Sequence, residues 1–203
     1  MGATVLLGIT GGIAAYKAPL LVRLMVKSGL NVHVIVSRSA TEFVTPLTLA
    51  TLSGNPVCQD MWKNRDKPSV EHISLADAAD MAVVAPATAN FIGKLANGVA
   101  DDMLTTTIMA VKAPVIICPA MNENMWLNEI VQENVNKLKR FGYHFVDPEY
   151  GEMACGGEGW GRLARLDKIV AAVIEVTNQL DSKAGADGIE TAKNNEVIEK
   201  RVV

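Results

Sequence analysis

Short runs of apolar residues alternate along the chain with longer segments in which apolar residues recur every three or four positions. The short runs have the length of β-strands, and the longer segments have the periodicity of amphipathic helices. Such alternation is typical of βαβ units, so the pattern predicts a parallel sheet. The predicted strands are residues 5–9, 31–36, 81–86, 115–118 and 143–146.

The helical segments lie between these strands and after the last of them. The predicted helices are residues 13–27, 72–79, 90–97, 101–110, 128–141 and 166–180. Residues 40–53 are broken by Pro46 into two short helical pieces, because proline cannot continue a helix. The order of elements predicts one α/β domain over residues 1–180. Its fold class is Rossmann-like (flavodoxin-like), with a parallel sheet and helices on both faces.

Three segments lack a regular period. Residues 54–70 are polar and irregular, and residues 151–161 contain five glycines in eleven positions. We expect the second of these segments to form a mobile loop. Residues 181–203 are polar throughout, which predicts a disordered C-terminal tail.

Composition narrows the class of protein. Of 203 residues, 49% are hydrophobic, which is enough to bury the core of one domain without disulfides. The net charge is −3, and acidic and basic residues are interspersed, so no basic surface for nucleic acid is expected. The longest apolar run, residues 110–119, is interrupted by Lys112 and two prolines. We therefore expect no membrane span and no signal peptide, and a cytoplasmic protein.

The three cysteines are far apart in the sequence. Cys58, Cys118 and Cys155 form no CxxC pair, which indicates a reducing compartment and argues against a metal site. Cys58 and Cys118 are interpreted as small buried hydrophobic residues. Cys155 lies in the glycine-rich segment, where core packing does not explain a cysteine.

Ligands of an open parallel sheet bind beyond the carboxyl ends of its strands, so chemistry is sought there. After the first strand, Gly11 and Gly12 form a tight turn that could offer backbone N–H groups to an anion; a turn without a ligand fits as well. After the second strand, Ser37 and Ser39 flank Arg38. Hydroxyls and a guanidinium suit a phosphate, although helix capping also explains the serines. Together these ends favour a mononucleotide over NAD.

The third and fourth strand ends leave similar alternatives. Thr88 and Asn90 could bind the polar edge of a planar ring, or could cap a helix. Residues 119–126 combine two methionines and a tryptophan with Asn122, which could be an apolar pocket with one directed amide, or core. His72 stands alone at a helix start, where a histidine is more often structural.

Five segments, taken together and in this order, resemble a known family. They are residues 11–17, 72–73, 86–90, 119–126 and 154–157. Over residues 3–180 the chain is similar to the homo-oligomeric flavin-containing cysteine decarboxylases. The resemblance implies FMN as the cofactor and a trimer or a dodecamer of trimers as the assembly.

The resemblance also implies a role for each matching residue. Gly11, Gly12, Ile13, Ser37 and Ser39 would lie along the phosphate and ribityl chain of FMN, and Thr88, Asn90, Phe91 and Ala120 near its isoalloxazine ring. His72 matches the catalytic histidine and Asn122 the residue that holds the substrate carboxylate. Cys155 matches an acid on a flap over the substrate, and Glu152 and Ala154 fall in the part of the flap that contacts the substrate.

The implied substrate is 4′-phospho-N-pantothenoylcysteine, in coenzyme A biosynthesis. Hydride transfer from the cysteine β-carbon to FMN, with loss of the thiol proton, would give a thioaldehyde that accepts the electrons of decarboxylation. The resulting ene-thiolate would be reduced to 4′-phosphopantetheine, with a proton from Cys155. Thr88 departs from the commoner serine of the family.

Three other readings compete with this one. A peptidyl-cysteine decarboxylase of lantibiotic-type biosynthesis commonly lacks the flap cysteine, so Cys155 argues against it. A flavin prenyltransferase would have a more basic phosphate site and no segment like that around Asn122. A non-catalytic flavoprotein regulatory subunit would be expected to carry longer extensions. Many bacterial members also carry a fused ligase, so a separate ligase is expected unless the sequence is a fragment.

Overall fold

The computed structural model describes residues 2–62, 71–154 and 156–180. Six parallel strands form one sheet in the order β3-β2-β1-β4-β5-β6, and β7 and β8 form a separate antiparallel hairpin. All five predicted strands are confirmed. The strands are β1 (Thr4–Ile9), β2 (Asn31–Val36), β3 (Val57–Cys58), β4 (Met81–Ala87), β5 (Val115–Pro119), β6 (His144–Phe145), β7 (Glu149–Glu152) and β8 (Glu158–Arg162).

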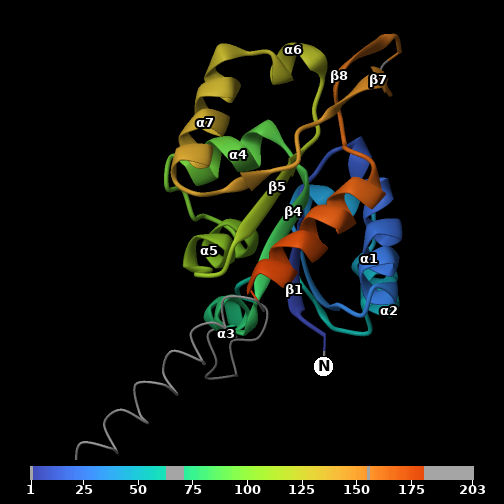
Figure 1. The fold of residues 1–203 in the computed structure, drawn as a ribbon, viewed down its shortest axis with the longest axis vertical. Helices are drawn as coiled ribbons and strands as arrows, with labels where there is room; N and C mark the ends of the chain where they lie inside the picture. Colours follow the sequence, from blue (N-terminus) through green and yellow to red (C-terminus); the bar gives the residue numbers. More distant parts are fainter. Residues whose placement is uncertain (1, 63–70, 155, 181–203) are drawn as a thin grey trace, which may run out of the picture.

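Helices connect these strands and cover both faces of the sheet (Figure 1). They are the 3₁₀ helices η1 (Ile13–Lys17) and η2 (Arg38–Glu42), the α-helices α1 (Ala18–Lys27), α2 (Pro46–Ser53), α3 (Glu71–Ala78), α4 (Ala89–Ala96), α5 (Met103–Ala110), α6 (Glu123–Trp126) and α7 (Glu129–Arg140), and a helix at residues 166–180. No helix among the described residues has both the length and the apolar character needed to cross a membrane.

One predicted helix is wrong in its first part. Residues 13–27 do not form a single α-helix, because the 3₁₀ helix η1 comes first and α1 begins only at Ala18. Pro19 lies in the first turn of α1. Since proline has no N–H to donate to the carbonyl four residues earlier, an α-helix cannot run through this position without losing a hydrogen bond.

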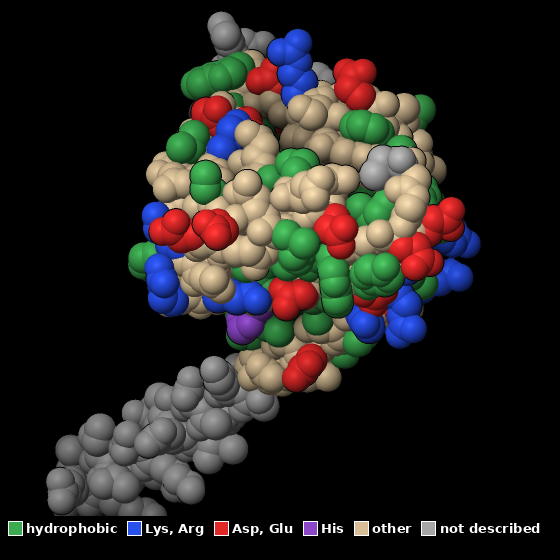
Figure 2. Space-filling view, turned by 90° about the horizontal axis from the view of Figure 1, so that it is seen from above, with side chains coloured by type: hydrophobic (Ala, Val, Ile, Leu, Met, Phe, Trp, Pro, Cys, Tyr) green, Lys and Arg blue, Asp and Glu red, His purple; other side chains and the backbone are tan. Residues whose placement is uncertain are grey.

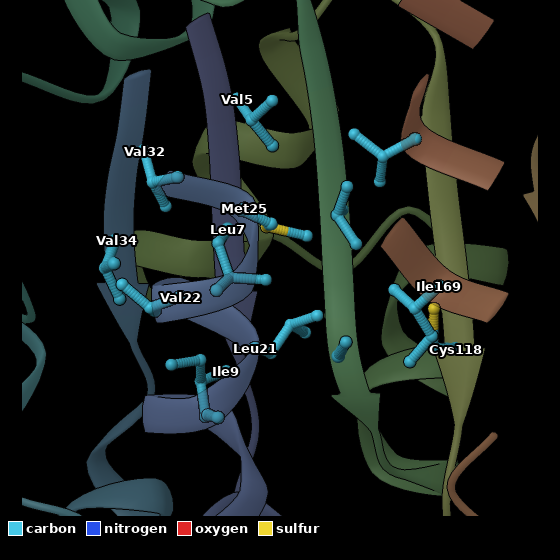
Figure 3. Packing of buried hydrophobic residues seen from close by; sticks show 14 of the residues in the cluster. Val5, Leu7, Ile9, Leu21, Val22, Met25, Val32, Val34, Cys118 and Ile169 are labelled. Atoms are coloured by element: carbon cyan, nitrogen blue, oxygen red, sulfur yellow. The ribbon is translucent and has the colours of Figure 1, made fainter. Parts of the chain in front are cut away.

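The buried strand residues alternate between two apolar layers. Val5, Leu7 and Ile9 of β1 point to the face that is covered by α1, α2 and the helix at residues 166–180 (Figure 3). Leu6 points to the other face, which is covered by α3, α4, α5 and α7. Strands buried on both faces explain why the predicted strands are continuous apolar runs. The two-layer arrangement confirms the predicted α/β fold.

The prediction of an irregular segment at residues 54–70 is wrong at Val57 and Cys58. These residues form β3, which pairs in parallel with Val34 and Ile35 of β2. A strand of two residues is too short to show a period, so the sequence pattern could not reveal it. Without β3, the remaining five parallel strands have the flavodoxin-like order 2-1-3-4-5 when they are counted along the chain.

The prediction of a loop at residues 151–161 is wrong at both ends of this segment, which belong to β7 and β8, whereas residues 153, 154, 156 and 157 lie outside the strands. Strands β7 and β8 pair from Glu149 to Arg162. Gly161 has a φ of +117°, and a Cβ added to it would lie 2.1 Å from the Met121 carbonyl oxygen. The Met121 N–H donates to the Gly161 carbonyl at 2.9 Å. The glycine therefore serves close docking of the hairpin onto the segment that follows β5. The predicted tail, residues 181–203, lies outside the described residues.

Replacing Gly161 with alanine should break this docking. The added methyl group would clash with a backbone carbonyl and would occupy a backbone conformation that favours glycine, so we expect a loss of about 2–4 kcal/mol in the free energy of unfolding. Urea denaturation followed by circular dichroism measures the loss.

Gly142→Ala is the matched control for this substitution. Gly142 also has a positive φ, +87°, but open space surrounds its Cβ position. We expect this control to lose only about 1–2 kcal/mol, the cost of the left-handed backbone alone. Equal losses in the two variants would contradict the importance of the Met121 contact.

Candidate functional site

A cavity of about 1130 Å³ lies at the carboxyl ends of β1 and β4. These neighbouring strands mark the point where the strand order reverses, which is where ligands bind in open α/β sheets. Pockets for single small molecules measure roughly 300–1,000 Å³, so this cavity has room for more than one ligand. Figure 2 looks onto the molecule from the end that carries α6 and the hairpin in Figure 1, and charges of both signs are interspersed across that face.

The cavity collects most of the site residues that the sequence suggested. Those that line it are Gly11, Gly12, Ile13, Ser37, Ser39, Thr88, Asn90, Phe91, Ala120, Asn122, Glu152 and Ala154. They come from the ends of β1, β2, β4 and β5 and from the β7 side of the hairpin. Segments far apart in the sequence therefore meet around one space.

Two of the suggested catalytic residues are not placed in this cavity. His72 is half-buried on α3 and does not line it. Figure 1 shows α3 at the end of the molecule opposite to α6 and the β7–β8 hairpin. Cys155 lies outside the described residues.

A buried threonine ties the two strand ends beneath the cavity. The Thr10 hydroxyl donates to the Pro86 carbonyl at 2.7 Å and accepts a hydrogen bond from the Thr88 N–H at 2.9 Å. The Thr10 N–H donates to the same Pro86 carbonyl at 3.2 Å. Only 4% of Thr10 is exposed, so these bonds are shielded from water. No pattern in the sequence pointed to this role of Thr10.

The glycine turn and the loop after β2 form one side of the cavity. A Cβ on Gly11 would lie 2.3 Å from the Ser39 Cβ, so only glycine allows the two turns to lie this close. The Ser37 hydroxyl accepts from the Ala40 N–H at 3.3 Å and caps η2. The capping interpretation of Ser37 is thus confirmed, and the residue also lines the cavity. Backbone N–H groups, hydroxyls and the Arg38 guanidinium at one place fit a phosphate group.

Another part of the cavity lining is largely apolar. Thr88 caps α4 by accepting from the Phe91 N–H at 3.3 Å, which confirms the capping interpretation there too. Ala120 and the first turn of α5 face the same space, and Met103 and Leu104 of that turn are buried. Small residues beside apolar side chains leave room for a planar ring. The α5 residues were missed, because their spacing looks like that of any buried helix.

The segment at residues 119–126 divides between site and core. Asn122 caps α6, since its Oδ1 accepts from the Asn124 N–H at 2.9 Å. This bond fixes the direction of the amide at the cavity. Met121 and Met125 also line the cavity, whereas Trp126 packs against the apolar layer on the α7 side of the sheet. The segment therefore contributes to the cavity lining and to the apolar core through different residues.

Glu123 of the same segment holds the hairpin. The Trp160 N–H donates to Glu123 Oε1 at 2.9 Å. Together with the bond between Met121 and Gly161, this contact places β8 beside α6. The Ala154 and Glu152 backbone is thereby brought to the rim that Asn122 occupies.

Four basic residues in the described part of the chain line the cavity: Lys17, Arg38, Lys94 and Arg162. Lys94 is neutralised, because its Nζ lies 2.8 Å from Asp101 Oδ1, and this bond raises the pKa of the lysine. Asp102 caps α5. Arg162 was not singled out from the sequence, and Lys17 was included only as the last residue of the matching segment 11–17, with no role assigned to it.

Cys58 differs from the predicted buried hydrophobic residue. It is half-buried, and its thiol donates to Glu71 Oε1 at 3.1 Å. Burial, followed by the contact with Glu71, raises the pKa of Cys58 to about 12. Burial alone raises the pKa of Cys118, whose complete burial is confirmed. Both thiols therefore stay protonated at neutral pH and are not nucleophiles. No three potential metal ligands gather within the described residues.

Comparison with known proteins places the chain in a family. The model of a family described as Flavoprotein matches residues 1–178. The chain is 51% identical over 166 residues to the coenzyme A biosynthesis bifunctional protein CoaBC of Bacillus subtilis, a match that covers 82% of this chain and 41% of that protein. The corresponding protein of Borreliella burgdorferi is 43% identical, with 96% and 50% covered. The chain thus spans half or less of the length of these relatives.

A shorter relative matches over nearly its whole length. A probable phosphopantothenoylcysteine decarboxylase of Streptococcus mutans is 42% identical over 173 residues, which are 84% of this chain and 97% of that protein. A solved PPC decarboxylase mutant in complex with pantothenoylaminoethenethiol has a TM-score of 0.80 and 30% identity, with 88% of this chain and 100% of that chain covered. The FMN-dependent cysteine decarboxylase SpaF has a TM-score of 0.73 and 29% identity, with 86% and 97% covered.

Replacing Thr10 with valine tests the tie between β1 and β4. Valine keeps the shape but leaves the Thr88 N–H without its acceptor, so we expect a loss of about 1–3 kcal/mol in the free energy of unfolding. Urea denaturation measures it. Thr107→Val is the control, because the buried Thr107 hydroxyl donates only to the Met103 carbonyl of its own helix, at 2.6 Å. A loss in Thr10→Val no larger than in this control would show that the tie contributes little.

Proposed function

Since this chain belongs to the Flavoprotein family, we propose that it is an FMN-dependent decarboxylase of 4′-phospho-N-pantothenoylcysteine that yields 4′-phosphopantetheine for coenzyme A biosynthesis. The observation that carries the proposal is the single cavity at the switch point of the sheet. It joins a glycine turn with hydroxyls and a guanidinium, a group of apolar residues and a directed amide, and its volume of about 1130 Å³ leaves room for a cofactor and a substrate.

The residues around the cavity fit FMN in two parts. We propose that Gly11, Gly12, Ile13, Ser37 and Ser39 hold the phosphate and ribityl chain, and that Thr88, Asn90, Phe91 and Ala120 lie beside the ring. The close packing of Gly11 on Ser39 supports the first part, because it joins the donors of two strand ends into one cradle. When bound, the flavin supplies a hydride acceptor, a chemistry that side chains lack.

The substrate side of the cavity is assigned to the segment after β5 and to the hairpin. Asn122 would orient the carboxylate that is lost, because its amide is already fixed by its capping bond. Glu152 and Ala154 would contact the substrate from the hairpin. Cys155 would donate the proton that completes reduction of the ene-thiol, a role that rests on the resemblance of the motif at residues 154–157.

His72 requires a second copy of the chain in this proposal. It does not line the cavity of its own chain, yet it is half-buried on α3 and accessible at the surface. We propose that it enters the cavity of a neighbouring subunit and takes up a proton during the first oxidation. This arrangement fits a homotrimer, or a dodecamer built of trimers, and a cytoplasmic location is proposed with it.

The similarity to SpaF favours one competing function. That protein is an FMN-dependent cysteine decarboxylase, and a peptidyl-cysteine decarboxylase would share the phosphate cradle and Asn122 with the present proposal. The two functions differ in the substrate and in the final reduction, so the product distinguishes them. A non-catalytic flavoprotein would bind FMN and form neither product.

The purified protein should be yellow and should convert 4′-phospho-N-pantothenoylcysteine to 4′-phosphopantetheine. Flavin absorbance and mass spectrometry of the products measure the two parts of this expectation. A cysteine-terminated peptide in the same reaction should remain unchanged. Decarboxylation of the peptide in preference would support the competing function, and a flavin-free protein that cannot be reconstituted would contradict the central claim.

Cys155→Ser should separate the two halves of the reaction. A serine hydroxyl is a much weaker acid than a thiol, so we expect carbon dioxide release to continue while the oxidised ene-thiol product accumulates. Product masses lower by two hydrogens than 4′-phosphopantetheine reveal it. Cys58→Ser is the control and should give the normal product, because Cys58 does not line the cavity. A normal yield of 4′-phosphopantetheine from Cys155→Ser would exclude Cys155 as the acid.

A further inference from the structure

We infer that Lys17 and Arg162 form a second anion subsite in the cavity, which binds the phosphate group at the far end of the substrate. Both residues line the cavity, one from the end of η1 and the other from the end of β8. The inference rests on the proposed function for the identity of the substrate. The location of the subsite follows from the charges around these two residues.

Arg162 has hydrogen-bonding capacity that the described residues do not use. Its Nε atom is buried and has no hydrogen-bond partner among the described residues. The nearest carboxylate is weakly engaged, since Arg162 Nη2 lies 3.9 Å from Glu149 Oε2. The side chain as a whole is 41% exposed, so its terminal N–H groups can donate to an anion in the cavity.

Lys17 adds a second positive charge to the same place. Burial, and then the positive charge of Arg162, hold the pKa of Lys17 below its ordinary value, against the opposing effect of Glu149. The ammonium and the guanidinium are therefore close enough to repel each other. Two cations that repel in the absence of a ligand form a favourable site for a group with two negative charges.

The neighbouring carboxylates do not cancel these charges. Lys168 Nζ lies 2.5 Å from Glu149 Oε1, and Arg165 Nε lies 3.3 Å from Asp167 Oδ1. Four cations thus face three carboxylates at the base of the hairpin, with Glu152 as the third, which leaves an excess of one positive charge. Glu152 lines the cavity next to Gly151, whose Cβ position lies 2.8 Å from Arg162 Nη1.

This subsite is distinct from the cradle proposed for the FMN phosphate. Gly12 is the N-cap of η1 and Lys17 is its last residue. Five residues of 3₁₀ helix rise about 10 Å, so the glycine turn and the Lys17 backbone lie at opposite ends of η1. One cavity then holds two phosphates without crowding their charges together.

The test compares 4′-phospho-N-pantothenoylcysteine with pantothenoylcysteine, which lacks the phosphate. The FMN-loaded wild-type enzyme should prefer the phosphorylated substrate by about 10- to 100-fold in kcat/KM, the range of one or two charge-assisted hydrogen bonds. Lys17→Gln and Arg162→Gln should each reduce this preference about tenfold. The loss should appear as a higher KM for the phosphorylated substrate with kcat nearly unchanged, because the phosphate is remote from the reacting atoms.

Control variants separate a lost subsite from a damaged fold. Arg165→Gln removes a positive charge close by without touching the cavity and should keep the wild-type preference. Lys17→Arg keeps the positive charge and should also keep the wild-type preference for the phosphorylated substrate. Flavin absorbance should show full FMN in every variant. An unchanged preference in Lys17→Gln and Arg162→Gln, or loss of FMN from them, would overturn the inference.

A binding measurement keeps the inference testable if the protein turns over neither substrate. Calorimetric titration of the FMN-loaded protein with 4′-phosphopantetheine and with pantetheine compares the two ligands without catalysis. We expect the phosphorylated ligand to bind at least about tenfold more tightly, and Lys17→Gln to remove the difference. Failure of turnover with this difference intact would reject the proposed function alone, whereas equal affinities would reject the subsite.

Discussion

The hydrogen bonds of the Thr10 hydroxyl hold together the two strand ends on which the site depends. In a parallel sheet with a switch point, the strands on either side lead their helices to opposite faces, so the space between their ends is open by construction. The bonds from Thr10 to Pro86 and Thr88 close the floor of that space. They fix the glycine turn after β1 against the loop after β4. The residues proposed to hold the phosphate and the apolar residues of the cavity lining follow these strand ends, so their positions depend on these hydrogen bonds.

The hairpin is the second constraint, and it gives the glycine-rich segment its purpose. Gly161 allows the backbone of β8 to approach Met121. The Glu123 carboxylate accepts a hydrogen bond from the N–H of Trp160, the residue before Gly161. Two motifs that are separate in the sequence thus become one wall of the cavity. The amide of Asn122 and the part of the hairpin that lines the cavity therefore cannot move independently at their base. The glycines of this segment suggest a loop, but in the structure they allow close packing between two backbones.

Much of the fold could be predicted, because buried parallel strands are continuous apolar runs and their helices are amphipathic. Strands such as β2 and β5 were evident for that reason. The two-residue β3 was not, since it has no period, and the hairpin was hidden by its glycines. At the site, residues carried by motifs were found. Thr10 and Arg162 were missed, and Lys17 received no role although it lies in the matching segment 11–17, because the importance of these residues lies in their contacts in space, which no local pattern encodes.

The charges in the cavity indicate which residues would select the substrate and which would take part in the reaction. The residues proposed to hold the flavin, together with Asn122, would contact the cofactor and the carboxylate that is lost. Both of these are the same for any cysteine-terminated substrate of this reaction. The cations at the hairpin base are different, because a peptide substrate offers no group with two negative charges to match them. Lys17 and Arg162 carry like charges that repel each other, and this repulsion lowers the stability of the folded chain. An anion bound between them would offset the repulsion. A site built in this way selects its substrate at the end remote from the reaction and leaves the reacting end common to the family.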